Sequence, residues 1–435
     1  MIMMVISMIP LSLMHMPNLF QICIIMFMMT FMTNYSSIFM SNISYFMGMD
    51  CMSYGLIVLS LFIISLMTMS MNWFFFKNKS LFLLMNLMLS FCLLMIFSSM
   101  NLLLMYIFFE FSLIPMLVMV FGWGYQPERL ISGLYLMFYT LFASLPLLLF
   151  MMFFYMTVGN LNMNNEILMN FKFIMNISMM MAFLVKLPMY MFHFWLPKAH
   201  VQAPVFGSMI LAGLLLKIGG YGIIRIMFLS KYLYLNYSYI WYSFSIIGSM
   251  LVSLICLTQM DVKSMIAYSS ISHMGLCIMG LMTMTKWGLF GIYMLMLSHG
   301  LCSSALFCLI SISYDRYHSR SFFLNKGLLN MMPSMTMFWF LSCSFNMSCP
   351  PSLNFISEIY ILVSMLFYWM NSAWIFVLIS FLSACFSYYL FSFTQHGNFH
   401  YLYCCSTGYC REYLLLIMHL IPTVMLIIIM NMYFF

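Results

Sequence analysis

The chain has 435 residues, of which 65% are apolar and only 5% are charged. A soluble fold of this length needs about a quarter of its residues charged to cover its surface. The composition therefore excludes water as the main solvent and predicts an all-α protein that crosses a membrane many times. The net charge of +7 is spread thinly, without the basic runs that bind nucleic acid.

Apolar runs between polar breaks predict about fourteen transmembrane helices, because a bilayer core of about 30 Å takes about 20 helical residues. Strands of a β-barrel would alternate over about ten residues, and these runs do not alternate. The predicted spans are 1–15, 17–33, 51–70, 80–98, 100–122, 132–156, 171–197, 203–225, 238–257, 264–284, 287–311, 329–371, 373–395 and 413–433. Proline cannot continue a helix ladder, so the seventh is expected to break at Pro188 and the twelfth at Pro350 and Pro351.

Basic residues are concentrated in the loops after odd-numbered spans, which hold nine of them against four in the even-numbered loops. The positive-inside rule then places both termini on the outer side. The interrupted spans come fourth in each of two five-helix groups, which predicts two inverted repeats. The expected divisions are 1–79 (helices 1–3), 80–231 (first repeat, helices 4–8), 232–395 (second repeat, helices 9–13) and 396–435 (a loop and helix 14).

Several titratable residues fall near the middle of a predicted span or just after a break. They are Glu110, Lys186, Lys217, His273, His299 and Glu358. An ionised side chain at this depth costs roughly 2.5–3.5 kcal/mol on insertion scales, so these residues are expected to face the bundle interior. Burial makes a lysine lose its proton readily, a nearby carboxylate restores it, and histidine titrates near neutrality. The set therefore predicts a proton relay.

The alternative for the same residues is static pairing, for instance of Glu110 with Lys186, which would only hold helices together. A lone histidine in a span can equally form an interhelical hydrogen bond. Near the end of the seventh span, FHFWLPKAH contains His193, Lys198 and His200. These three form either a candidate proton entrance or an interfacial group with Trp195 as its anchor.

Other polar residues indicate less. Charged residues at helix ends are interpreted as solvated: Glu128, Arg129, Asp261, Lys263, Asp315 and Arg316. One C-terminal cluster, whose spacing matches no common zinc pattern, comprises His396, His400, Cys404, Cys405 and Cys410. No metal site is therefore expected. The sequence contains neither a G-x-G-x-x-G turn after a strand nor a P-loop, so nucleotide chemistry is expected elsewhere.

Four segments carry a family resemblance: FFEFSLIPM, FLVKLPMYMFHFWLPKAHVQAPVFGSMILAGLLLKIGGYGIIR, DVKSMIAYSSISHMG and LSHGLCSSALF. They resemble the antiporter-like (Mrp-type) membrane subunits of respiratory complex I, and among these the chain 4 family of mitochondrial NADH–ubiquinone oxidoreductase. The resemblance covers nearly the whole chain and is strongest over about 100–310. Around the double proline, NMSCPPSLNFISE departs from the family pattern by small-residue changes.

The resemblance implies fourteen helices, discontinuous helices 7 and 12, and proton translocation across the inner mitochondrial membrane, driven by electron transfer from NADH to ubiquinone. The family's glutamate of helix 5 falls on Glu110, and its lysines of helices 7 and 8 fall on Lys186 and Lys217. Its histidines of helices 10 and 11 fall on His273 and His299. The glutamate of helix 12 falls on Glu358, where chains 2 and 5 carry lysine.

The resemblance also implies partners and a location. Chains 2 and 5 and membrane lipids, cardiolipin among them, are the expected neighbours, and both termini face the intermembrane space. FMN, iron–sulfur clusters and ubiquinone are expected in partner subunits, with no cofactor in this chain. The alternative is a stand-alone Mrp-type cation/proton antiporter.

Overall fold

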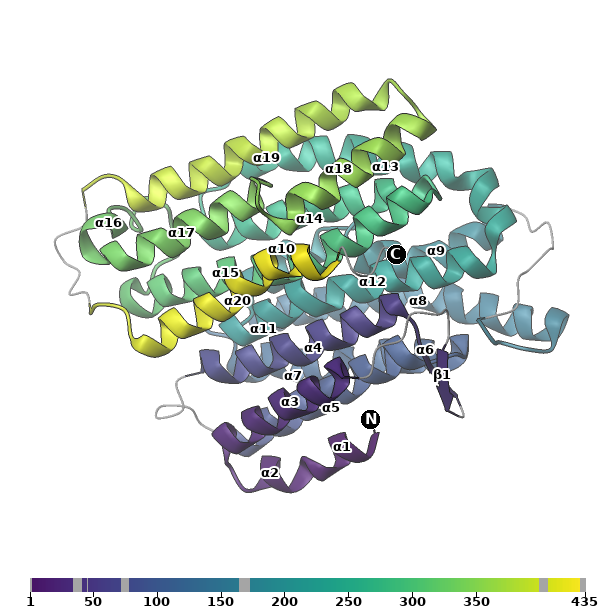
Figure 1. The fold of residues 1–435 in the computed structure, drawn as a ribbon, viewed down its shortest axis with the longest axis horizontal. Coiled ribbons are helices and arrows are strands. Elements are labelled where there is room, and N and C mark those ends of the chain that lie inside the picture. Colours follow the sequence, from purple (N-terminus) through teal and green to yellow (C-terminus); the bar gives the residue numbers. More distant parts are fainter. Residues whose placement is uncertain are drawn as a thin grey trace. The chain divides into compact units, whose positions relative to one another are not determined.

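The computed structural model describes residues 2–33, 41–44, 46–71, 78–163, 173–398 and 406–430, and these are almost entirely helical (Figure 1). Helices satisfy every backbone amide and carbonyl within one segment, which hydrocarbon requires. The chain divides into two compact units. Unit 1 comprises Met1–Leu187 and Gln202–Ser238, and unit 2 comprises Pro188–Val201 and Tyr239–Phe435.

Unit 1 is a helical bundle with one short hairpin, in which β1 (Ser41–Ser44) pairs antiparallel with β2 (Met47–Met49). Its helices are α1 (Ile2–Ser7), α2 (Ile9–Leu13), α3 (Pro17–Met32), α4 (Cys51–Ser70), α5 (Lys79–Ser98), α6 (Leu102–Phe111), α7 (Leu113–Trp123), α8 (Arg129–Val158), α9 (Phe173–Lys186), α11 (Val205–Ile210), the π-helix η1 (Leu211–Leu215) and α12 (Leu216–Leu229). Helix α4 packs against α3 and α5, and α9 packs against α8 and α12 (Figure 1).

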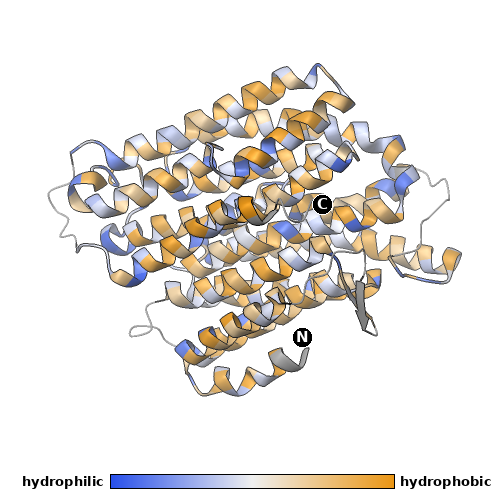
Figure 2. Cartoon of the chain, viewed as in Figure 1, coloured by the Kyte–Doolittle hydropathy of each residue, from blue (hydrophilic) through white to orange (hydrophobic). Residues whose placement is uncertain are grey.

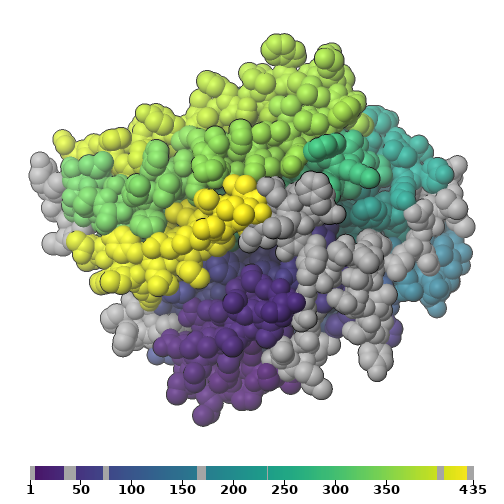
Figure 3. Space-filling view, viewed as in Figure 1, coloured from purple at the N-terminus to yellow at the C-terminus, as the bar shows by residue number. Residues whose placement is uncertain are grey.

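Unit 2 is built around α15, which packs against α14, α17, α18 and α20. Its helices are α10 (Trp195–Gln202, whose last residue belongs to unit 1), most of α13 (Lys231–Leu257), α14 (Val262–Met282), α15 (Lys286–Tyr317), α16 (Leu328–Met331), α17 (Pro333–Asn346), α18 (Leu353–Tyr368), α19 (Ser372–Gln395) and α20 (Cys410–Met430). Figure 3 shows α20, in yellow, lying beside the green helices of this unit.

Ten helices among the described residues are long and apolar enough to cross a membrane, and three shorter apolar helices accompany them. Figure 2 shows that hydrophobic residues, in orange, predominate along the helices. Many large apolar side chains are exposed. Phe142 and Met156 of α8 are 81% and 79% exposed, and Trp374 of α19 is 77% exposed. Such surfaces are stable in lipid, which is as apolar as the side chains themselves. The chain is therefore a multi-pass membrane protein.

Both predicted helix breaks are present. Helix α9 ends at Lys186, two residues before Pro188, and α10 begins only at Trp195. Helix α17 ends at Asn346, and α18 begins at Leu353 after the two prolines.

Two further irregularities were not expected. The span predicted at 100–122 is divided at Ser112 into α6 and α7. The span predicted at 203–225 contains the π-helix Leu211–Leu215 and continues to Leu229.

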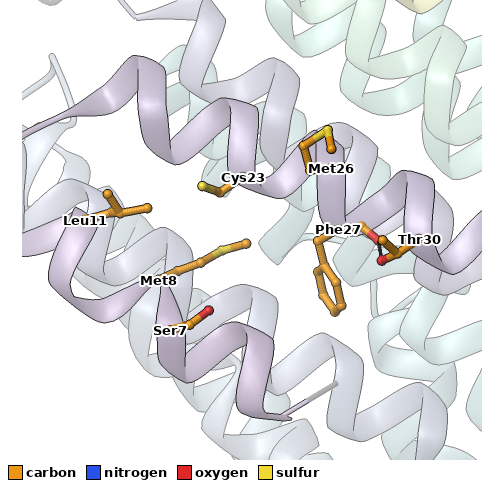
Figure 4. A pocket seen from close by; sticks show the side chains of 7 residues that line it. All are labelled: Ser7, Met8, Leu11, Cys23, Met26, Phe27 and Thr30. Atoms are coloured by element: carbon orange, nitrogen blue, oxygen red, sulfur yellow. Dashed lines mark hydrogen bonds between the residues drawn. The ribbon is translucent and has the colours of Figure 1, made fainter.

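A cavity of about 240 Å³ lies near the N-terminus, where side chains of the first two helical segments face those of α3 (Figure 4). It is lined by Ser7, Met8, Leu11, Cys23, Met26, Phe27 and Thr30. None of the predicted site residues lines this cavity.

Candidate functional site

Lys186 and Glu110 come together in unit 1. Lys186 is the last residue of α9, where the helix dipole favours a cation, and only 3% of it is exposed. Its Nζ donates to the Phe109 carbonyl over 3.0 Å and lies 3.3 Å from the centroid of the Phe109 ring. Phe109 directly precedes Glu110 in α6, so these contacts hold the lysine beside the glutamate.

Glu110 has two buried carboxylate oxygens, and neither accepts a hydrogen bond of ordinary length and angle. Lys186 and Ser144 of α8 are the charged and polar groups that act on this carboxyl. A buried carboxylate without hydrogen bonds is costly unless a charge compensates for it. Lys186 is the compensating charge, so the ionisation states of the two residues depend on each other.

Lys217 lies just after the π-helix, at the second position of α12, and is fully buried. Its Nζ donates to the Ala212 carbonyl, five residues earlier, over 2.6 Å. A π turn shifts carbonyls out of the α-helical register, and such turns occur frequently at functional sites. The irregular backbone thus supplies an acceptor for this fully buried amine.

Glycines let α12 approach α9 closely. A Cβ built on Gly222 would lie 2.0 Å from the Phe183 ring, and one on Gly219 would lie 2.8 Å from the Leu187 amide. A side chain at Gly219 would require the backbone just after α9 to move, and one at Gly222 would require the Phe183 ring to move. The KIGGYG segment therefore fixes the packing of the two helices that carry the lysines of unit 1.

A buried ion pair at the far end of α12 was missed by the sequence analysis. Arg225 Nη1 lies 2.5 Å from Asp50 Oδ2, and the two side chains are 2% and 5% exposed. Asp50 also directly precedes α4, and its backbone amide donates to Ser53 Oγ over 2.8 Å. The Arg225 guanidinium lies 4.7 Å from the Tyr221 ring centroid. Arg225 is the last residue of the span predicted at 203–225, but it lies inside α12, which continues to Leu229.

Glu358, His273 and His299 come together in unit 2, from α18, α14 and α15. Glu358 is 8% exposed and accepts a hydrogen bond of 2.5 Å from Ser348 Oγ at its Oε1. His273 Nδ1 lies 3.8 Å from the same oxygen. The His273 and His299 rings have centroids 5.6 Å apart. The three titratable groups thus form a continuous series inside one unit.

The three residues of the candidate proton entrance differ in exposure. His193 lies buried in the helix break, 4.5 Å from the Phe194 ring between centroids. His200 is fully buried and stacks on Phe307 at 4.7 Å. Lys198 is exposed. The interfacial alternative fails at Trp195, which is only 3% exposed and cannot anchor at a membrane surface.

Arg316 corrects another expectation, because it is buried and paired rather than solvated. Its side chain is 4% exposed, and its Nη2 lies 2.7 Å from Glu412 Oε2. It also donates to the carbonyls of Ser406 and Thr407, which precede α20.

Within the parts of the chain that the structure describes, no group of three or more His, Cys, Asp or Glu side chains could hold a metal ion. His400, Cys404 and Cys405 lie outside those parts.

Comparisons with known proteins show the family of the chain. Residues 99–387 match the family described as "NADH:quinone oxidoreductase/Mrp antiporter, TM", and residues 1–96 match "NADH-ubiquinone oxidoreductase chain 4, amino terminus". NADH-ubiquinone oxidoreductase chain 4 of Ceratitis capitata is 50% identical over 94% of this chain and 92% of its own length. The chain belongs to the NADH-ubiquinone oxidoreductase chain 4 family. The chain 4 protein of Aedes aegypti is likewise 50% identical, over 94% of this chain and 92% of its own.

Solved structures show the same fold for this chain 4 family member. A chain of "Respiratory complex I from Thermus thermophilus with bound NADH" matches with a TM-score of 0.86, covering 97% of this chain and 93% of that one at 19% identity. A chain of "Structure of Mrp complex from Dietzia sp. DQ12-45-1b" matches with a TM-score of 0.72, covering 81% and 68% at 18% identity. The antiporter-like fold is therefore established for the chain.

Proposed function

We propose that the chain is a core membrane-arm subunit of respiratory complex I that translocates protons across the inner mitochondrial membrane. Translocation is coupled to electron transfer from NADH to ubiquinone in partner subunits, which hold FMN and the iron–sulfur clusters. The names of the curated relatives and the extent of the likeness to complex I support this proposal. The chain then takes part in NADH:ubiquinone reductase as a subunit without a redox centre, beside chains 2 and 5 and cardiolipin-containing lipid.

The proposed topology has fourteen helices with both termini in the intermembrane space. Two inverted five-helix repeats, 80–231 and 232–395, follow three N-terminal helices in 1–79 and precede the loop and last helix of 396–435. The positions of the helix breaks support this arrangement. The α9–α10 break follows Lys186 and the α17–α18 break precedes Glu358, so each proposed repeat has an interrupted helix beside a buried charge.

One observation carries the proton-translocating role: neutral groups help to hold the buried charges of the relay. Lys186 and Lys217 donate to backbone carbonyls, and Glu358 accepts from a serine hydroxyl. A carbonyl or hydroxyl carries no net charge. When its partner gains or loses a proton, no uncompensated charge is therefore left behind on it. By contrast, Arg225 lies 2.5 Å from its carboxylate partner Asp50, and losing one charge there would strand the other.

The chemistry that follows is proton exchange in two centres. In unit 1, an ionised Glu110 stabilises the Lys186 ammonium, and protonation of Glu110 removes that stabilisation, so Lys186 releases its proton. Lys217 is the next lysine in the proposed order. In unit 2, His273 exchanges protons with Glu358 on one side and His299 on the other, because neutral imidazole has both a donor and an acceptor nitrogen. His193, Lys198 and His200 remain the proposed entrance, with Lys198 at the surface.

The test is quinone-linked proton translocation by the assembled complex in liposomes. We expect Lys186→Ala and Glu110→Gln to reduce translocation strongly while the complex still assembles. Lys286→Ala is the matched control, because Lys286 begins α15 and is exposed. Full translocation by assembled Lys186→Ala complex would remove Lys186 from the mechanism. Failure of both variants to assemble would favour the static-pairing alternative.

A second candidate is a stand-alone cation/proton antiporter, favoured by the fold likeness to the Mrp chain. That likeness covers less of both chains than the likeness to complex I does. Purification of the native assembly separates the two candidates. Flavin, iron–sulfur clusters and quinone-reductase activity that co-purify with the chain support the first, and cation/proton exchange without them supports the second.

A further inference from the structure

The break between α17 and α18 places a hydroxyl against Glu358. Ser348 is 7% exposed, and its Oγ donates to Glu358 Oε1 over 2.5 Å. The two residues are ten positions apart, so the contact depends on the break rather than on helical spacing. The same carboxylate oxygen lies 3.8 Å from His273 Nδ1.

The Ser348 bond differs from those of most buried serines in this protein. Serines within the helices donate to a carbonyl of their own helix, three or four residues earlier. Ser357, which directly precedes Glu358, donates to the Asn354 carbonyl over 2.6 Å in this way. Ser348 lies outside the helix ladder and directs its hydroxyl at a titratable side chain instead.

The backbone of the break is arranged so that Ser348 can do this. Its φ of 61° lies in the left-handed region, which turns the chain out of α17. Asn354 Nδ2 donates to the Phe345 carbonyl over 2.8 Å, and Ser298 of α15 donates to Asn354 Oδ1. These bonds tie both ends of the break to α15, so the position of the Ser348 hydroxyl is fixed by three helices.

We propose that Ser348 is a positioning residue for proton exchange at Glu358, holding Oε1 of the carboxyl group toward His273. The inference rests on the proposed proton-translocating function. A hydroxyl both donates and accepts, so Ser348 donates to the ionised carboxylate and can accept from the protonated form. The Glu358 carboxyl group therefore keeps the same orientation in its ionised and protonated forms. In both forms Oε1 faces the His273 imidazole, with which it exchanges the proton.

The decisive variant is Ser348→Gly, which removes the hydroxyl and suits the positive φ, so the fold of the break is preserved. Ser357→Ala is its matched control, since it removes an equally buried neighbouring hydroxyl that bonds only its own helix. Glu358→Gln provides the reference for loss of the carboxyl. All three are measured in the assembled complex, by the rate of quinone-linked proton translocation and by infrared difference spectra of the carboxyl C=O stretch during turnover.

We expect Ser348→Gly to slow translocation about tenfold, as for loss of one hydrogen bond to a charged group, and to move the C=O band that Glu358→Gln abolishes. Ser357→Ala should leave both unchanged. An unmoved band and native translocation in Ser348→Gly, with Glu358→Gln defective, would overturn the role of Ser348. Native translocation in Glu358→Gln would instead overturn the proposed role of Glu358.

Discussion

The Asp50–Arg225 pair allows a quantitative prediction about how unit 1 is held together. Both side chains are almost fully buried and their charged atoms lie 2.5 Å apart. Removing one partner of such a pair leaves an uncompensated charge in an apolar surrounding, at a cost of about 3–5 kcal/mol. We therefore expect Arg225→Gln and Asp50→Asn each to destabilise the contact between the end of α12 and the start of α4 by this amount.

Hydrogen–deuterium exchange of the assembled complex measures this local opening directly. A loss of 3–5 kcal/mol corresponds to amide exchange faster by roughly 100-fold to several thousand-fold, because about 1.36 kcal/mol is a factor of ten. The affected amides should lie in the last turns of α12 and the first turn of α4. The α15–α20 contact, which has its own pair in Arg316 and Glu412, serves as the internal control.

The double variant separates pairing from packing. Asp50→Asn with Arg225→Gln replaces both charges with amides, so no buried charge is stranded and the cost should be clearly less than the sum of the single variants. Additive costs would show that the two residues act independently. Single variants that exchange no more than about twofold faster than the native chain would refute the reasoning, since the pair would then be solvated.

Three other predictions follow from the same geometry. Lys217→Arg keeps the positive charge but cannot release a proton in this range, so we expect an assembled complex whose translocation is lost in liposome assays. Gly222→Ala places a methyl group 2.0 Å from the Phe183 ring, and we expect about 1–3 kcal/mol of destabilisation, seen as less assembled complex on native gels and partly restored by Phe183→Leu. Arg316→Gln strands Glu412, so limited proteolysis should cut the segment before α20 faster than in the native chain.

Helix positions were predictable because hydrocarbon imposes length and apolarity on each crossing. The span predicted at 51–70 has the same ends in the structure as α4, Cys51–Ser70. The breaks after Lys186 and before Leu353 were predictable because proline lacks the amide that the helix ladder needs. The π-helix at Leu211–Leu215 was not, because its side chains are as apolar as those of an α-helix and no proline or polar residue marks it.

Depth of burial was predictable for the lysines and glutamates, and so was the pairing of Glu110 with Lys186, but the partners of Arg225 and Glu358 were not. Arg225 and Asp50 are 175 positions apart, and hydropathy alone cannot pair them. The signal that could have revealed Arg225 is the apolar segment after it, which allows α12 to continue for another turn. Ser348 lies in a segment whose path depends on the break, and nothing in the composition directs its hydroxyl to Glu358.

The irregular backbone and the buried charges of the relay belong together physically. A regular helix pairs its own amides and carbonyls, so it offers a buried charge fewer polar partners than a helix break does. Lys186 ends α9 at a break, Lys217 follows a π turn, and Glu358 follows the break from which Ser348 donates to it. Arg225, in a regular stretch of α12, is held instead by a carboxylate from another element. A protein that only needed to hold its helices together could use pairs of the second kind throughout. Under the proposed function, a helix distortion that gives a lysine a carbonyl lets the lysine change its charge without stranding a charged partner, which static pairing does not require.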